Sequence, residues 1–187
     1  PLEFTNRIGT PLVEGLIFVH NSLIGFDLRK DIRIIASGKI TTGFDIIKRL
    51  AMGADLCYSA RGMMMALGCI QALKCNTNTC PVGVTTQDRK LMVGLVPNDK
   101  SVRVYNFQKN IVKSACEMMG AMGLENTDDL KPWHLMRRTE AYEIRNYSEI
   151  YDFLKPGDLL QEPLPESYAR AFQAAKAESF NDVKLPS

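Results

Sequence analysis

Apolar residues recur at helical spacing near the start of the chain. Between Thr10 and Leu28 they lie three or four positions apart, at Leu12, Leu16, Val19, Leu23 and Ile24. Thr10 and Pro11 supply a capping residue and a proline at the first helical position, so this stretch predicts a helix. The next pattern, from Arg33 to Ser37, is a short apolar run. It predicts a buried parallel strand, because such strands lack polar alternation.

A second pair of elements follows in the same order. Thr42 and Gly43 predict the start of a helix from Phe44 to Met52. Residues Asp55 to Ser59 predict a second buried strand. A strand, a helix and a strand in this order indicate a β-α-β unit over residues 33–59, because parallel strands need a crossover connection.

One long amphipathic pattern dominates the middle of the chain. After a polar stretch at residues 87–100, a helix is predicted from Val102 to Met122, with Cys116 on its apolar stripe. The rest of the stripe consists of Val104, Phe107, Ile111, Ala115, Met118 and Met119. We expect residues 1–123 to form one domain.

The apolar pattern weakens from residue 124 to residue 187. A short capped helix is predicted near Asn126 to Leu130, and another from Glu166 to Glu178. We expect residues 124–187 to form a helical and extended tail that wraps a partner or a neighbouring domain.

Composition indicates a folded, globular chain. Of the 187 residues, 45% are hydrophobic and 24% are charged, which is typical of one domain with a substantial core. The 23 basic and 21 acidic residues are interleaved, so the charge pattern favours neither nucleic acid nor an anionic membrane as a partner. No apolar stretch approaches the roughly 20 residues of a membrane helix. Since no signal peptide is visible, a reducing, cytoplasmic location is expected.

Three of the five cysteines lie together in a polar loop at residues 68–81. Cys69, Cys75 and Cys80 are spaced Cys-x5-Cys-x4-Cys, and Pro81 follows the last of them. Three thiols in so short a loop indicate a ligand set, and a proline often follows a cysteine ligand of an iron–sulfur cluster. An iron–sulfur site is the first hypothesis, with Thr77, Asn78 and Thr79 placed to hydrogen-bond its sulfurs.

Other roles for these cysteines fit the sequence less well. The odd number of cysteines and the expected reducing compartment disfavour disulfides. A structural zinc site normally has four protein ligands, whereas only His20 and His134 are available elsewhere, both far away along the chain. Cys57 and Cys116 lie in an apolar strand and a helix stripe, where cysteine behaves as a small hydrophobic residue.

Small residues and cations follow the two predicted strands. Ser37, Gly38 and Lys39 follow the first strand, and Ser59, Ala60 and Arg61 follow the second. Small residues let backbone N–H groups approach an anion, and the two cations add compensating charge. Such turns match the phosphate site that (β/α)8 barrels build after strands 7 and 8. Tight turns without a ligand use the same residues, but the cysteine loop beside them favours a phosphate-bearing redox cofactor.

These segments together resemble the C-terminal part of the FMN-binding domain of glutamate synthases. The resemblance lies in residues 34–45, 52–57, 59–61, 66–71 and 86–88, and in Cys75-Asn-Thr-Asn-Thr-Cys-Pro-Val-Gly-Val84. It extends from Pro1 to about Phe107. It implies an α/β fold that is the C-terminal portion of a (β/α)8 TIM barrel, with an inserted iron–sulfur loop and a helical C-terminal tail.

The resemblance also implies the cofactors. In glutamate synthases three cysteines at this spacing hold a [3Fe–4S] cluster. The cluster passes electrons to FMN, which reduces 2-iminoglutarate, formed from 2-oxoglutarate and ammonia, to L-glutamate. By this likeness Cys69, Cys75 and Cys80 are cluster ligands, and the two turns line the FMN phosphate. Lys39 stands where the large enzymes usually have a second glycine, which suggests the shorter, stand-alone branch of the family. No catalytic residue is identified.

The chain supplies only two of the eight strands of a barrel, which needs roughly 250 residues. We therefore expect an N-terminal barrel segment or subunit as a partner, an electron donor that is an NADPH-dependent subunit or ferredoxin, and an oligomer. Two other functions fit part of the pattern. One is a non-catalytic iron–sulfur electron-transfer or docking subunit. The other is a barrel like inosine-monophosphate dehydrogenase, which would use one nucleophilic cysteine rather than three.

Overall fold

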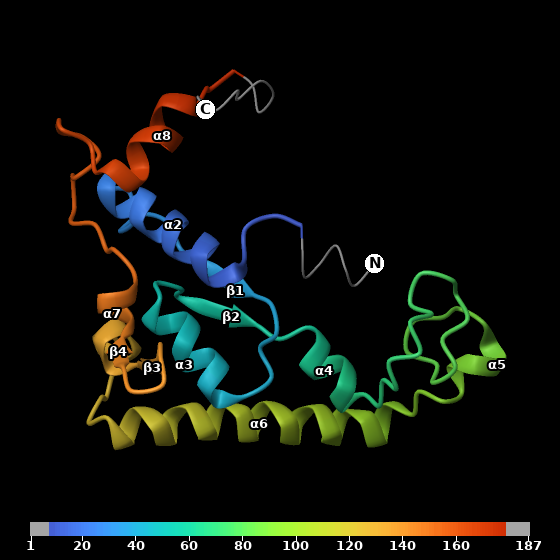
Figure 1. Ribbon diagram of the computed structural model, residues 1–187. Coiled ribbons are helices and arrows are strands. Elements are labelled where there is room, and N and C mark those ends of the chain that lie inside the picture. The colour runs from blue at the N-terminus through green and yellow to red at the C-terminus, as the bar shows by residue number, and fades with distance from the viewer. Residues whose placement is uncertain (1–7, 179–187) are drawn as a thin grey trace.

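The structure, a computed structural model shown in Figure 1, describes residues 8–178. Residues 1–7 and 179–187, the outer ends of the two expected domains, lie outside the described residues. In chain order the elements are α2 (Leu12–Gly25), β1 (Ile35–Ser37), α3 (Gly43–Ala51), β2 (Leu56–Tyr58), α4 (Arg61–Ala66), α5 (Arg89–Met92), α6 (Pro97–Ala121), η1 (Thr127–Asp129), η2 (Pro132–His134), β3 (Met136–Arg138), β4 (Ile144–Asn146), α7 (Tyr147–Ile150) and α8 (Glu166–Ala174).

The predicted β-α-β unit is confirmed. Strands β1 and β2 pair in parallel, with Ala36 opposite Cys57, and α3 is the crossover between them. Helix α3 begins after Thr42, because the Thr42 hydroxyl accepts the N–H of Asp45 at 3.2 Å and the Asp45 carboxylate accepts the N–H of Thr42 at 2.9 Å. This reciprocal capping satisfies two backbone donors that a helix start otherwise leaves unpaired.

The expectation that both strands are buried is wrong for one face of the sheet. Ala36 is buried and Cys57 is half-buried beneath the helices. On the opposite face Ile35, Leu56 and Tyr58 are 43%, 55% and 61% exposed. Strands β1 and β2 form a two-stranded sheet, and no (β/α)8 barrel closes among residues 8–178, so nothing there covers this face.

Helix α6 is longer than predicted and forms the base of the molecule in Figure 1. It begins at Pro97 rather than at Val102, because proline at the first helical position needs no hydrogen-bonded N–H. Its residues Ile111, Ala115 and Met119 are buried, in a row four positions apart. Cys116 lies one position outside that row and is exposed, so its expected place on the apolar stripe is wrong.

The C-terminal part contains an antiparallel pair, β3 and β4, that the sequence pattern did not predict. Helix α8 ends at Ala174, four residues before the predicted end at Glu178.

The tail packs back on α2, as Figure 1 shows. The rings of Tyr168 and Phe18 stack at 5.4 Å, and the Leu159 N–H donates to the Gly25 carbonyl at 3.0 Å. The tail thus contacts α2 of its own chain. Within the described part, no helix is both long and apolar enough to span a membrane.

Candidate functional site

The three loop cysteines line one small cavity. Helix α4 ends before Gly68, whose φ of 99° turns the chain into the loop. Cys69, Cys75 and Cys80 all border the cavity that follows. Its other lining is mainly apolar and includes Ile70, Leu73, Val82 and Val84. The structure therefore brings the predicted ligands together around one apolar space.

The three thiols are not gathered tightly enough to share a single metal ion. In the described part of the chain, no three His, Cys, Asp or Glu side chains are gathered for a shared ion. In a multi-iron cluster each thiolate binds a different iron, so the sulfurs need to surround the cluster rather than meet at one point.

The loop backbone is held in an unusual conformation. Gln71, Leu73 and Asn78 have φ values of 57°, 55° and 61°, in the left-handed region that favours glycine. Each such residue costs on the order of 1–3 kcal/mol and is maintained by its surroundings, which is common at ligand sites.

Cys80 is the most buried of the three cysteines, and its surroundings favour the thiolate. The backbone N–H of Thr85, followed by its hydroxyl, lowers the pKa of Cys80, and burial opposes this change. The N–H groups of Val82 and Val84 add to the lowering, and the resulting pKa is about 7. Residues 82–85 thus favour the thiolate form of Cys80.

Two of the predicted donors, the Thr77 and Thr79 hydroxyls, make hydrogen bonds within the loop, whereas Asn78 uses its amide oxygen as an acceptor. The Thr77 and Thr79 hydroxyls are hydrogen-bonded to each other at 2.7 Å. The Asn78 side chain accepts the N–H of Gln87 at 2.6 Å. These bonds stabilise the loop instead. Sequence reasoning missed Thr85, because nothing in Pro81-Val-Gly-Val-Thr85 marks which side chain will lie beside a cysteine sulfur.

Two cations of α6 approach the start of the loop. The Arg103 guanidinium and the Lys100 ammonium both lie within 4 Å of the position that a Cβ on Gly68 would take. Lys100 also pairs with Asp99 at 3.0 Å. Positive charge here favours an anionic group in the cysteine cavity.

Part of the predicted phosphate site is brought together at the carboxyl ends of the two strands. Ser37, Ser59 and Ala60 line one cavity of about 470 Å³. The Ser59 hydroxyl donates to the Ile40 carbonyl at 2.5 Å, which ties the two turns to each other.

The other predicted phosphate residues lie around this cavity without lining it. Arg61 is the exposed first residue of α4, and Lys39 is exposed on the first turn. Gly38 has a φ of 146°, and a Cβ there would meet a Leu12 methyl group at 3.1 Å. Lys39 has a φ of 53°, a conformation that glycine adopts at no steric cost.

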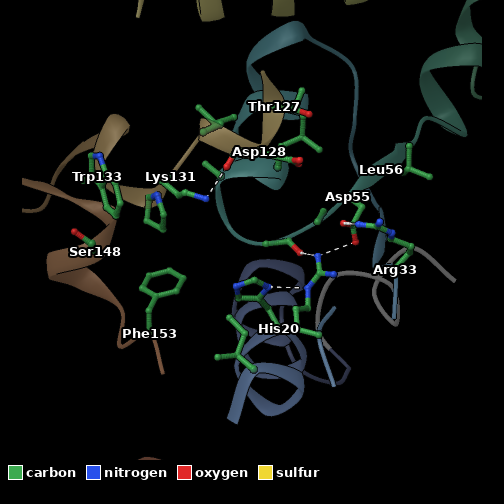
Figure 2. A pocket seen from close by; sticks show the side chains of 18 residues that line it. His20, Arg33, Asp55, Leu56, Thr127, Asp128, Lys131, Trp133, Ser148 and Phe153 are labelled. Carbon is green, nitrogen blue, oxygen red and sulfur yellow. Dashed lines mark hydrogen bonds and ion pairs between the residues drawn. The ribbon is translucent and has the colours of Figure 1, made fainter. Parts of the chain in front are cut away.

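A separate cleft of about 640 Å³ lies at the amino ends of the strands. Figure 2 shows His20, Arg33 and Asp55 on one side of it and Trp133 and Phe153 on the other.

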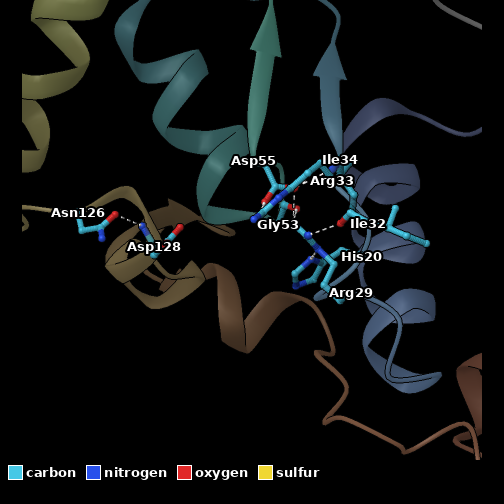
Figure 3. Close-up of polar contacts among 9 residues, drawn as sticks. All are labelled: His20, Arg29, Ile32, Arg33, Ile34, Gly53, Asp55, Asn126 and Asp128. Atoms are coloured by element: carbon cyan, nitrogen blue, oxygen red, sulfur yellow. Dashed lines mark hydrogen bonds and ion pairs between the residues drawn. The ribbon is translucent and has the colours of Figure 1, made fainter.

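Arg29 connects this cleft to the strand starts, as Figure 3 shows. Its guanidinium donates to His20 Nδ1 at 3.2 Å, to the Gly53 carbonyl at 3.0 Å and to the Asp55 carboxylate at 2.7 Å. Asp55 also accepts the N–H of Ile34 at 2.7 Å.

These bonds alter the ionisation of the cleft residues. Burial, together with the Arg29 charge, lowers the pKa of His20 to about 4. Burial alone would raise the pKa of Asp55, but the bonds from Ile34, Arg29 and Arg33 outweigh it, and the pKa is lowered. Arg29 is hydrogen-bonded to both His20 and Asp55. The network therefore joins α2 to the strands and has a structural role.

Comparison with known proteins places these features in a family. The family model described as the conserved region in glutamate synthase matches residues 1–125. The chain is 36% identical over 148 residues to the glutamate synthase large subunit-like protein YerD of Bacillus subtilis, covering 79% of this chain and 28% of that protein. It is 34% identical over 131 residues to the archaeal glutamate synthase (NADPH) of Methanocaldococcus jannaschii, covering 70% and 26%.

A third relative is the ferredoxin-dependent glutamate synthase 2 of Synechocystis, which is 32% identical over 148 residues. That match covers 78% of this chain but 9% of the relative, so the chain spans about a quarter or less of the length of these three proteins. Since the matched region at residues 1–125 contains both strand turns and all three loop cysteines, the chain belongs to the glutamate synthase family.

Proposed function

We propose that this chain is the C-terminal segment of a glutamate-synthase-type oxidoreductase in which Cys69, Cys75 and Cys80 hold a [3Fe–4S] cluster. The observation that carries the proposal is that all three thiols line one apolar cavity. When bound, the cluster supplies single electrons and an FMN supplies the hydride that converts 2-iminoglutarate to L-glutamate.

The surroundings of the thiols support this role. Iron binds the thiolate form, and the donors around Cys80 lower its pKa to about 7, so much of this thiol is ionised near neutral pH. A mainly apolar lining borders the three cysteines, and Arg103 and Lys100 offset the negative charge of a thiolate-bound cluster.

The turn residues Ser37, Gly38, Lys39, Ser59, Ala60 and Arg61 are proposed to hold the FMN phosphate. The cavity that Ser37, Ser59 and Ala60 line lies at the carboxyl ends of parallel strands, where barrels of this class place their active sites. Met63 of α4 lines this cavity, and the next residue, Met64, lines the cysteine cavity. Adjacent positions on one helix thus border both cavities, which would give electrons a short path between them.

The remaining strands and the electron donor are proposed to come from other parts of the assembly. The chain covers 28% of the length of its Bacillus relative. We propose that an N-terminal barrel segment completes the fold, and that an NADPH-dependent subunit or ferredoxin delivers the electrons. The full unit would work in glutamate biosynthesis in the cytoplasm.

Anaerobic reconstitution with iron and sulfide tests the cluster assignment. The purified chain should gain bound iron and broad visible absorption. Cys75→Ser should lose both, because one iron loses its thiolate ligand. Cys116→Ala is the matched control, since Cys116 is exposed like Cys75 but lies on α6, and it should keep both signals. Unchanged iron content in the Cys75→Ser variant would refute the proposal.

A further inference from the structure

Thr85 carries a buried hydroxyl that forms no hydrogen bond with a described residue. Its Oγ1 has less than 1 Å² of accessible surface. A buried hydroxyl without a partner is unfavourable, because it has lost its bonds to water. We therefore expect this hydroxyl to donate to a hydrogen-bond acceptor when the site holds its ligand.

The other threonine hydroxyls of the loop are already committed. Thr77 and Thr79 bond to each other at 2.7 Å, and Thr86 donates to the Asn78 carbonyl at 2.6 Å. Among these four threonines, Thr85 alone has a hydroxyl that is free to turn toward a ligand atom.

The sulfur of Cys80 is the acceptor that the geometry offers. Thr85 and Cys80 line the same small cavity, together with the other two cysteines. Both residues border this confined space, so the Thr85 hydroxyl can turn toward the Cys80 sulfur. A thiol is a weak acceptor, whereas a thiolate bound to iron carries negative charge and accepts hydrogen bonds strongly.

We propose that the Thr85 hydroxyl donates a hydrogen bond to the Cys80 sulfur and thereby raises the reduction potential of the cluster that this loop holds. The inference rests on the proposed function and makes Thr85 a positioning and tuning residue rather than a ligand. The step that it affects is the uptake of one electron by the cluster. No bond of Thr85 breaks, and its proton stays on the oxygen.

The direction of the effect follows from charge. The added electron makes the cluster and its thiolates more negative, so a donor to a sulfur stabilises the reduced form more than the oxidised form. Removing the hydroxyl should therefore shift the midpoint potential to a more negative value. A tenfold change in the one-electron equilibrium constant corresponds to about 59 mV, which is the expected scale.

The test is an anaerobic redox titration of the reconstituted full chain with dithionite, followed by electron paramagnetic resonance and visible absorption. Thr85→Val keeps the shape but removes the hydroxyl, and its potential should be more negative than that of the wild type. Thr85→Ser restores a hydroxyl and should restore the potential. Thr77→Val is the matched control, because its hydroxyl bonds to Thr79, and its potential should not change.

Each outcome decides the inference. A Thr85→Val potential equal to that of the wild type would overturn it while leaving the cluster assignment intact. A wild-type chain that takes up no iron would overturn the proposed function and this inference with it. If Thr85→Val and Thr85→Ala bind no iron while Thr85→Ser does, the hydroxyl is needed for the cluster itself, which supports the bond. If none of these three variants binds iron while the wild type does, the site does not depend on the hydroxyl alone, and the inference is overturned.

Discussion

His20 shows how one side chain can make stability depend on pH. Burial and the Arg29 charge lower its pKa to about 4, whereas the unfolded chain has the ordinary value near 6.5. Between these values the unfolded chain binds the proton more readily, so the free energy of unfolding falls as pH decreases. The stability that neutral His20 contributes is fully present above pH 6.5 and is lost as the pH falls toward 4. We expect the free energy of unfolding to fall by at most about 3 kcal/mol over this range.

Urea unfolding at pH 7, 6 and 5 measures this loss. His20→Gln is the control, because glutamine does not titrate, and its stability should fall less over the same range. The Asp45 and Asp55 carboxylates have lowered pKa values, so their contributions are lost only at more acidic pH. An equally steep loss in His20→Gln would show that another group is responsible.

The site residues that stand at an unusual spacing in the sequence could be predicted. Residues whose role depends on contacts with distant parts of the chain could not. The spacing of Cys69, Cys75 and Cys80 identified the loop, and the structure places them around one cavity. Thr85 and Asn21 could not be recognised, because their roles depend on partners that folding brings to them. Asn21 lies on α2 but is fully buried by a tail more than 130 residues away.

At the scale of elements, helices α3 and α6 pack closely at one point. A Cβ on Gly43 would lie 2.6 Å from the Ala115 backbone nitrogen, so α3 can approach α6 only with glycine there. Gly43→Ala should force the helices apart and lower the free energy of unfolding by about 1–3 kcal/mol. Gly120→Ala on α6 is the control, because a Cβ there meets nothing within 4 Å.

Thermal and urea unfolding of both variants test this packing. Gly120→Ala should be stabilised by roughly 0.5 kcal/mol, since alanine loses less backbone entropy in a helix. Gly43→Ala with wild-type stability would mean that the two helices are not held at this distance in solution.

Asn21 of α2 makes three hydrogen bonds to the tail. Its amide donates to the Asp152 carbonyl at 2.8 Å and to the Tyr168 hydroxyl at 2.7 Å, and its oxygen accepts the N–H of Leu154 at 3.2 Å. Asn21→Ala leaves these tail groups unpaired and should cost about 1–3 kcal/mol. Hydrogen exchange should then become faster in residues 151–174.

Ser22→Ala is the matched control for the tail. The Ser22 hydroxyl bonds to Phe18 of its own helix at 2.8 Å and not to the tail, so exchange in residues 151–174 should stay slow. Equal protection of the tail in Asn21→Ala and in the wild type would rule out this anchoring role.

Among the described elements, local patterns predicted the longer helices α2, α3, α6 and α8 but not α4, α5, α7 or the β3–β4 pair. Thr42 and Gly43 predicted the start of α3 at Phe44, and the structure agrees within one residue. The β3–β4 pair is short, and its sequence Met136-Arg-Arg138 has no apolar alternation. Its pairing depends on a turn and on contacts with η2 rather than on a buried face.

At the scale of the whole molecule, the open face of the β1–β2 sheet is the main incomplete feature. Ile35, Leu56 and Tyr58 are exposed there, although parallel sheets are normally covered on both faces. Both strands also have a free edge with unpaired backbone groups, since the sheet contains only these two strands in the described residues. The interior of a closed barrel would cover this face, and neighbouring strands would pair with the free edges. The match covers 28% and 26% of the length of two relatives, so those proteins contain much more chain that can supply these parts.

We therefore expect the 187-residue chain, expressed alone, to self-associate or to require an N-terminal barrel segment. Light scattering after size-exclusion chromatography should give a mass above that of a monomer. Leu56→Lys places a charge on the open face and should shift the mass toward a monomer, because a buried lysine opposes association. Tyr142→Lys is the control, since Tyr142 is fully exposed outside this sheet, and it should leave the mass unchanged. A monomeric wild-type chain that unfolds cooperatively without a partner would contradict the idea that this face is an interface.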